Sequence, residues 1–137
     1  MKAVLDASAI IPALVGDHPK HSACSEWFAK GETGSVELAM SQHTVAEIYS
    51  ALTGLRVGPT VVTQQINSLN MEVVELSRSH YFDAVSRLSA AGLPGGISYD
   101  MLHLIAAEHW GANVLVTANA RDFERLPMSV AIQIVSL

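Results

Sequence analysis

Short apolar segments alternate with helix-like segments along the chain, and this alternation restricts the fold more than any other feature. Buried strands are predicted at 2–5 (KAVL), 36–40, 72–76 and 114–117, with an edge strand at 132–135. Helices are predicted at 8–15, 19–30, 44–55, from Pro59 onward, 79–91, 98–110 and 119–126. Strands separated by helices form a parallel sheet that helices cover on both faces. We therefore expect an α/β fold.

The length of 137 residues predicts a single domain over residues 1–137, large enough to enclose a hydrophobic core. Half of the residues are hydrophobic and 15% are charged, which excludes a disordered chain. Asp6 interrupts the apolar start before a signal peptide could form, and no apolar run approaches the length of a membrane span. We expect a soluble cytoplasmic protein without membrane association.

The formal net charge of −5 disfavours a simple electrostatic nucleic-acid binder, because such proteins are usually basic. An enzyme that meets nucleic acid through bound cations is still compatible with this charge. Cys24 is the only cysteine, so the chain has neither an internal disulfide nor a cysteine-based zinc site.

Four acidic residues stand where a parallel sheet would gather a ligand. Asp6 ends the first predicted strand, and Asp122 follows the strand 114–117. Glu47 and Asp100 are expected in the first turns of the helices 44–55 and 98–110. Ligands of open parallel sheets bind beyond the carboxyl ends of the strands, so the four acids are expected at one rim.

Each acid also has an ordinary structural explanation. Asp6 could cap the first helix, Thr44 and Glu47 fit a capping box, and helix N-termini could stabilise Asp100 and Asp122. Four acids at one rim, however, would repel one another unless a divalent cation lay among them. Oxygen ligands favour Mg²⁺ or Mn²⁺, which can activate water and stabilise charge at phosphorus. The spacing alone thus makes a metal-dependent phosphodiesterase plausible.

Four stretches occur in an order that a known family shares: VLDASAI, TVAEIYSALTG, ISYDMLHLIAAE and LVTANARDFERL. Over essentially its full length the chain resembles a PIN domain, and specifically the VapC-like ribonuclease toxins of type II toxin–antitoxin systems. The resemblance implies an α/β/α sandwich around a central, mainly parallel sheet. It also implies a metal-dependent endoribonuclease that leaves a 5′-phosphate and a 3′-hydroxyl, with Mg²⁺ (or Mn²⁺) held by clustered acids.

The resemblance also assigns site residues. Asp6, Glu47 and Asp100 match the three core acids, which are expected to be catalytic and to bind the metal. The family's fourth acid varies in position, and here Asn119 occupies one usual place and Asp122 the other, so we assign Asp122. Three residues are expected to support the site by hydrogen bonding: Ser8, Thr117 and Asn119. Helix capping by Ser8 and strand-end hydrogen bonding by Thr117 are equally compatible with the sequence.

Partners follow from the same resemblance. It implies an RNA substrate, a homodimer and a small VapB-like antitoxin, with which the toxin can form a hetero-oligomer. Two alternatives stay open: a PIN-type nuclease with a non-toxin role or a DNA substrate, and a catalytically silent PIN-like binding module. A haloacid-dehalogenase-like phosphatase is disfavoured, since it needs a second aspartate two residues after the first and Ser8 stands there.

Three further polar residues lie near the predicted rim. His103 follows Asp100 by one helical turn and could approach the acids, although a buried histidine with a satisfied hydrogen bond is the favoured interpretation. Arg121 and Arg125 flank Asp122 and could contact phosphate, but surface charge explains them slightly better.

Overall fold

A computed structural model describes all 137 residues and contains one five-stranded sheet in the order β3-β2-β1-β4-β5. All four neighbouring strand pairs are parallel, as the alternation of strands and helices predicts. The first strand thus lies at the centre of the sheet, and the last one at an edge, as expected. The strands are β1 (Lys2–Leu5), β2 (Glu37–Ser41), β3 (Glu72–Val74), β4 (Val114–Thr117) and β5 (Gln133–Ser136).

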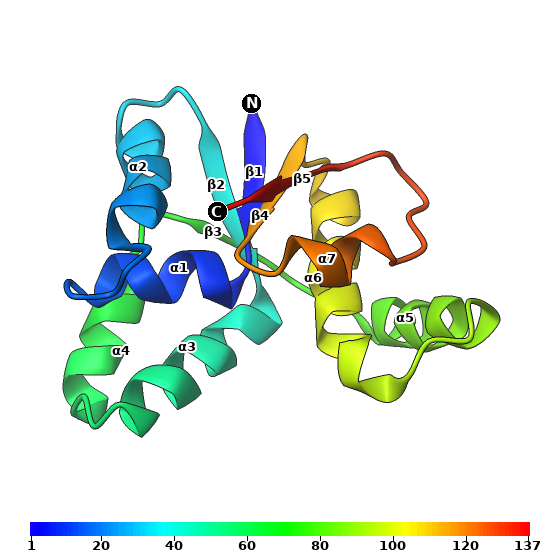
Figure 1. The fold of residues 1–137 in the computed structure, drawn as a ribbon, viewed down its shortest axis with the longest axis horizontal. Coiled ribbons are helices and arrows are strands. Elements are labelled where there is room, and N and C mark those ends of the chain that lie inside the picture. The colour runs from blue at the N-terminus through cyan, green and yellow to red at the C-terminus, as the bar shows by residue number, and fades with distance from the viewer.

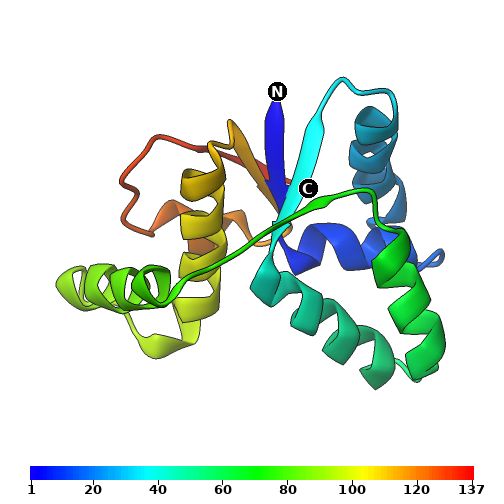
Figure 2. The ribbon, with the colours of Figure 1, turned by 180° about the vertical axis from the view of Figure 1, so that it is seen from behind.

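Helices cover both faces of the sheet and make the α/β/α sandwich. Figure 1 shows α1–α4 on one side of the strands and α5–α7 on the other, and Figure 2 shows the same two layers from behind. The helices are α1 (Ala7–Leu14), α2 (His21–Glu32), α3 (Gln42–Gly54), α4 (Pro59–Ser68), α5 (Arg78–Ala90), α6 (Ser98–Trp110) and α7 (Ala120–Glu124), with a short 3₁₀ turn η1 (Gly95–Ile97). None of these helices combines the length and apolarity that a membrane crossing requires.

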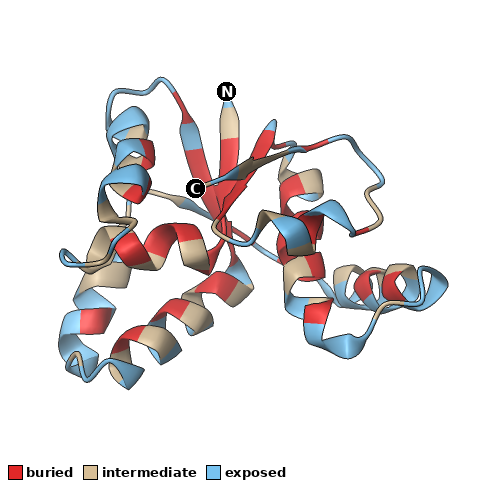
Figure 3. Ribbon diagram, viewed as in Figure 1, coloured by how far each residue is buried: buried red, intermediate tan, exposed pale blue.

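The two faces of the sheet enclose two separate cores. Side chains along a strand point alternately to opposite faces. Ala3 and Leu5 of β1 therefore pack in the cluster beneath α1–α4, whereas Val4 between them packs in the cluster beneath α5–α7. Figure 3 shows these buried residues along the central strands and on the inner faces of the helices.

Helix α6 is the most deeply buried helix. Its residues Met101–Ala107 are all buried, which agrees with their apolar character around the whole helix. The helix spans the predicted residues 98–110, and Gly111 ends it in the left-handed conformation, with φ of 76°. This conformation is one that glycine adopts without the strain a side chain would introduce.

One boundary differs from its prediction in a way that affects a site residue. The expected helix 44–55 begins at Gln42, directly after the last residue of β2, Ser41. The extended backbone of Ser41 (φ −71°, ψ 154°) leads into the helix without an intervening loop. Glu47 therefore lies in the second turn rather than the first, and Thr44 is not an N-cap, so the proposed capping box is absent.

Candidate active site

The four predicted acids lie beyond the carboxyl ends of the strands, on four different elements. Asp6 immediately follows β1, and Glu47 lies on α3, which β2 enters directly. Asp100 lies in the first turn of α6, and Asp122 lies on α7, two residues into the helix that follows β4. The charges of the other three acids all act on Asp100. The fold thus brings the four carboxyl groups into one electrostatic neighbourhood.

Asp6 is buried, with 4% of its surface exposed, and hydrogen bonds hold both of its oxygens. Oδ1 accepts hydrogen bonds from Ser8 Oγ at 2.6 Å and from the Ala9 backbone N–H at 3.1 Å, and Oδ2 accepts one from Thr117 Oγ1 at 2.7 Å. The bond from Ala9 also makes Asp6 the N-cap of α1. Burial raises the pKa of Asp6 although these hydrogen bonds act in the opposite direction.

The two hydroxyl groups beside Asp6 are themselves held by the backbone of the segment after β4. Ser8 Oγ accepts a hydrogen bond from the N–H of Ala118 at 2.9 Å, and Thr117 Oγ1 accepts one from the N–H of Asn119 at 2.9 Å. Each hydroxyl can therefore direct its own hydrogen toward Asp6. Ser8 and Thr117 thus fix the orientation of this carboxylate, whereas Asn119 contributes its backbone and makes no side-chain hydrogen bond.

Asp100 differs from Asp6, since no hydrogen bond holds its half-buried carboxyl group. Burial raises the pKa of Asp100 to about 6. This pKa includes the charges of Asp6, Asp122 and Glu47, which raise it together with burial, and the effect of the nearby His103, which acts to lower it. This environment disfavours the charged form and would favour a bound cation.

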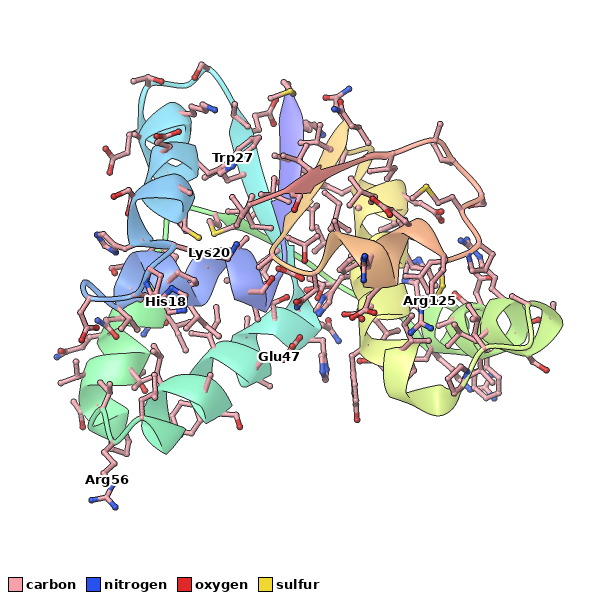
Figure 4. All side chains as sticks on the ribbon, in the orientation of Figure 1. His18, Lys20, Trp27, Glu47, Arg56 and Arg125 are labelled. Atoms are coloured by element: carbon pink, nitrogen blue, oxygen red, sulfur yellow. The ribbon has the colours of Figure 1, made fainter.

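Glu47 contacts a buried histidine that the opposite helix layer supplies. His103 of α6 is 2% exposed; its Nδ1 lies 2.7 Å from Ser41 Oγ, and its Nε2 lies 2.7 Å from Glu47 Oε1. Burial acts to raise the pKa of Glu47, but the contact with His103 and the charges of His103 and His43 outweigh it and lower the pKa. Figure 4 labels Glu47 on α3, near the middle of the molecule.

The predicted burial and hydrogen bonding of His103 are confirmed, but the contact between its second nitrogen and Glu47 was not predicted. The only signal is its spacing of three residues from Asp100, which places the two on neighbouring positions of one helix face. Nε2 of His103 lies 2.7 Å from the buried Oε1 of Glu47, close enough to hold the carboxyl group of Glu47 in place.

Asp122 is the most open of the four acids. Its side chain is 49% exposed, and Arg125 Nη2 lies 3.6 Å from its Oδ1. Asp122, Asn119 and Arg121 line one side of a surface hollow of about 370 Å³. Arg125 thus pairs with the predicted fourth acid, and Arg121 stands at the same hollow.

The donor chemistry of this site fits a hard divalent cation. The charges of Asp6, Glu47 and Asp122 all act on the carboxyl group of Asp100. No three histidine, cysteine, aspartate or glutamate side chains are close enough together to form a ready ligand set. The fit therefore rests on donor type and charge, since carboxylate oxygens suit Mg²⁺ and Mn²⁺.

Comparison with known proteins places the chain in a family. The model of the PIN domain family matches residues 3–128. The structure of VapBC2 from Rickettsia felis, bound to a promoter DNA fragment, is similar with a TM-score of 0.71 and 20% identity, covering 100% of this chain and 99% of that one. VapBC-1 from nontypeable Haemophilus influenzae gives a TM-score of 0.65 and 25% identity, covering 99% and 98%.

A third similar structure is VapC20 of Mycobacterium tuberculosis, described as a Sarcin-Ricin loop cleaving toxin. It has a TM-score of 0.66 and 11% identity, covering 82% of this chain and 86% of that one. No curated protein matches the sequence. The family match nevertheless runs from β1 through α7 and includes all four acids. The chain belongs to the PIN domain family.

Proposed function

We propose that this protein is a metal-dependent endoribonuclease and the toxin of a VapBC-type pair, formed by a single PIN domain over residues 1–137 and acting in the cytoplasm. The observation that carries the proposal is the match to the PIN domain family over residues 3–128, together with the four acids that the fold gathers around Asp100. Acidic groups so arranged favour a bound divalent cation. The likeness to VapBC-1, at 25% identity over nearly both whole chains, supports the toxin assignment.

Asp6 and Asp100 would hold the cation directly, because both are presented from buried elements. Glu47 would reach it directly or through water, and Asp122 would hold a second ion or the surrounding water. When bound, Mg²⁺ (or Mn²⁺) would activate water and neutralise the negative charge that develops on the phosphate.

The residues of the chain itself have separate tasks in this proposal. Ser8 and Thr117 hold the Asp6 carboxylate in one orientation. The lowered pKa of Glu47 keeps its carboxyl group ionised near neutral pH, so it can attract a cation and orient the attacking water. His103 positions Glu47 from the opposite side.

The proposed partners are an RNA substrate, a second copy of the chain and a VapB-like antitoxin. The Rickettsia and Haemophilus structures are both VapBC proteins, which supports the antitoxin. The net charge of −5 suits a partner with basic side chains. Such a side chain near the acids would compete with the cation.

Cleavage assays with isosteric variants test the nuclease. Wild type, Asp6→Asn and Asp100→Asn are incubated with structured RNA, single-stranded RNA and DNA, in Mg²⁺, in Mn²⁺ and with a chelator. Asp17→Asn is the matched control, because Asp17 is exposed and lies outside the site. We expect metal-dependent RNA cleavage by wild type and the control only. Equal cleavage by all four proteins, or cleavage of DNA alone, would contradict the proposal.

Expression in cells tests the toxin role separately. Wild type should arrest growth, Asp100→Asn should not, and the small protein encoded beside the gene should restore growth and copurify with the chain. Growth unaffected by an active nuclease would refute the toxin role and leave the nuclease itself standing.

A further inference from the structure

A groove of about 460 Å³ runs beside Glu47, on the α1–α3 side of the acids. Its walls come from α3, from the start of α6 and from two apolar residues of α1. Small side chains of α3, Ala46, Ser50 and Ala51, leave space along its floor. The groove therefore opens directly next to a proposed metal-binding acid.

Two aromatic rings meet at the mouth of this groove. His43 of α3 stacks on Tyr99 of α6, with ring centroids 4.7 Å apart and planes inclined by 11°. Tyr99 is 55% exposed, although aromatic side chains are usually buried. The stack holds the Tyr99 ring from one side, so the ring is fixed in position while much of its surface faces solvent.

Each of the two stacked residues lies next to one of the acids. Tyr99 precedes Asp100 in the chain, and Nε2 of His43 lies 3.9 Å from Oε1 of Glu47. The His43 ring also lies against the ring of His103, with centroids 6.0 Å apart. A group that packed on Tyr99 would therefore lie near Glu47, since the His43 ring contacts both residues.

The chemistry of the groove suits a base rather than a phosphate. No lysine or arginine lines it, and Glu47 would repel an anion. The arginines near the acids, Arg121 and Arg125, stand instead on the α7 side. Stacking on an aromatic side chain stabilises a flat uncharged base, whichever base it is. The hydroxyl of Ser50 and the ring nitrogens of His43 can hydrogen-bond its edge.

We propose that Tyr99, held in place by His43, is the stacking platform for an unpaired nucleobase of the RNA that is cleaved at the acids. This inference rests on the proposed nuclease function and adds a site for the substrate. Tyr99 binds and positions the strand, and it takes no part in the chemical step. The enzyme accordingly requires an unstacked base next to the cleaved bond, which single-stranded RNA and loops provide.

Kinetics of single-stranded RNA cleavage test the platform. Tyr99→Ala should raise KM about tenfold and change kcat little, whereas Tyr99→Phe, which keeps the ring, should behave as wild type. Ala46→Leu, which fills the groove and leaves the stack intact, should also raise KM. Tyr81→Ala is the matched control, since Tyr81 is an exposed tyrosine of α5, on the other helix layer.

A binding readout separates this inference from the nuclease assignment. In Tyr99→Trp, a short single-stranded RNA added in Ca²⁺ should quench the fluorescence of the new tryptophan, beyond any change in wild type. Wild-type KM in Tyr99→Ala, with unchanged thermal unfolding, would overturn the platform and leave the nuclease standing. Absence of cleavage by wild type would refute the nuclease, and quenching would still report whether a base stacks on this ring.

Discussion

At the scale of single residues, two aspartates of the site show how much a carboxyl group depends on its surroundings. Asp6 is more deeply buried, but three hydrogen bonds favour its charged form. Asp100 has no such bonds and faces three other acids. The carboxylate of Asp6 is thus a hydrogen-bond acceptor with a fixed orientation, whereas the charged form of Asp100 is destabilised by its surroundings.

Asparagine in place of Asp100 should stabilise the metal-free protein at neutral pH. The pKa of Asp100 is about 6 when folded against 3.8 as its ordinary value, so the folded state binds the proton more tightly. The stability of wild type therefore falls as the pH rises from about 4 to about 6. After a discount for solvent screening, Asp100→Asn should be more stable by about 1–2 kcal/mol above pH 6.

Thermal unfolding in a chelator, from pH 4 to pH 8, measures this difference. It should vanish toward pH 4, where both proteins carry a neutral side chain at this position. Asp17→Asn should show no comparable gain. A constant difference across the whole range would contradict the assigned cause.

Valine in place of Thr117 should weaken both the fold and the site. The substitution keeps the shape but removes the hydrogen bond to Asp6 Oδ2 and the acceptor for the N–H of Asn119. We expect a loss of about 1–3 kcal/mol in the free energy of unfolding and a metal affinity about 10- to 100-fold weaker. Denaturant unfolding and metal titration measure the two effects.

Thr63→Val is the control for this substitution, because the Thr63 hydroxyl is exposed and bonds only to its own helix. An unchanged metal affinity in Thr117→Val would show that Asp6 keeps its orientation without this hydroxyl.

Sequence reasoning singled out the four acids because each was expected to follow a strand or to begin a helix, which is a local signal, although Glu47 lies in the second turn of α3. It could not reveal the contact between His103 and Glu47. These residues are 56 positions apart, and only the packing of α6 beside α3 joins them. The roles of the acids as metal ligands stay predictions.

At the scale of helices and strands, periodicity was a reliable guide where burial was strongest. The helix 98–110 and the strand 114–117 have the predicted bounds, and both lie in the core. The start of α3 was wrong by two residues, because β2 passes into it without the turn residues that mark a helix start. Helix α2 was predicted to start at Pro19 but starts at His21, with Lys20 as the N-cap.

Two glycines on helices should respond oppositely to alanine. A Cβ at Gly31 of α2 would lie 2.7 Å from Cδ1 of the buried Leu38, whereas a Cβ at Gly54 of α3 would meet nothing within 4 Å. Gly54→Ala should stabilise the protein by up to about 1 kcal/mol through helix propensity. Gly31→Ala should lose about 1 kcal/mol or more, because Leu38 must shift within the core.

Denaturant unfolding of both variants measures these changes. The double variant Gly31→Ala/Leu38→Val should lose less free energy of unfolding than the sum of the losses in the two single variants. Strict additivity would mean that the two side chains do not meet.

At the scale of the whole molecule, the sheet joins two helix layers at a rim crowded with negative charge. The acids on this rim come from both layers: Glu47 from α3 on one side, Asp100 and Asp122 from α6 and α7 on the other. Repulsion among these acids acts between the two layers and lowers the stability of the folded state when no cation is bound.

A divalent cation should therefore stabilise the entire fold. With Mn²⁺ or Mg²⁺ at about 100 times its dissociation constant, the free energy of unfolding should rise by about 2.7 kcal/mol. The double variant Asp6→Asn/Asp100→Asn should show no such rise, while Asp17→Asn should respond as wild type. Calorimetric unfolding with each metal measures this. An equal response of the double variant would place the bound ion elsewhere.

The place of β1 in the sheet also has a consequence for the order in which the protein is made. One of the two hydroxyl groups that hold Asp6 belongs to Thr117, 111 residues later in the chain, on the strand that pairs beside β1. During synthesis Asp6 therefore leaves the ribosome well before the strand that completes its surroundings. A growing chain that does not yet include β4 lacks these surroundings, so the proposed activity has to wait for that strand.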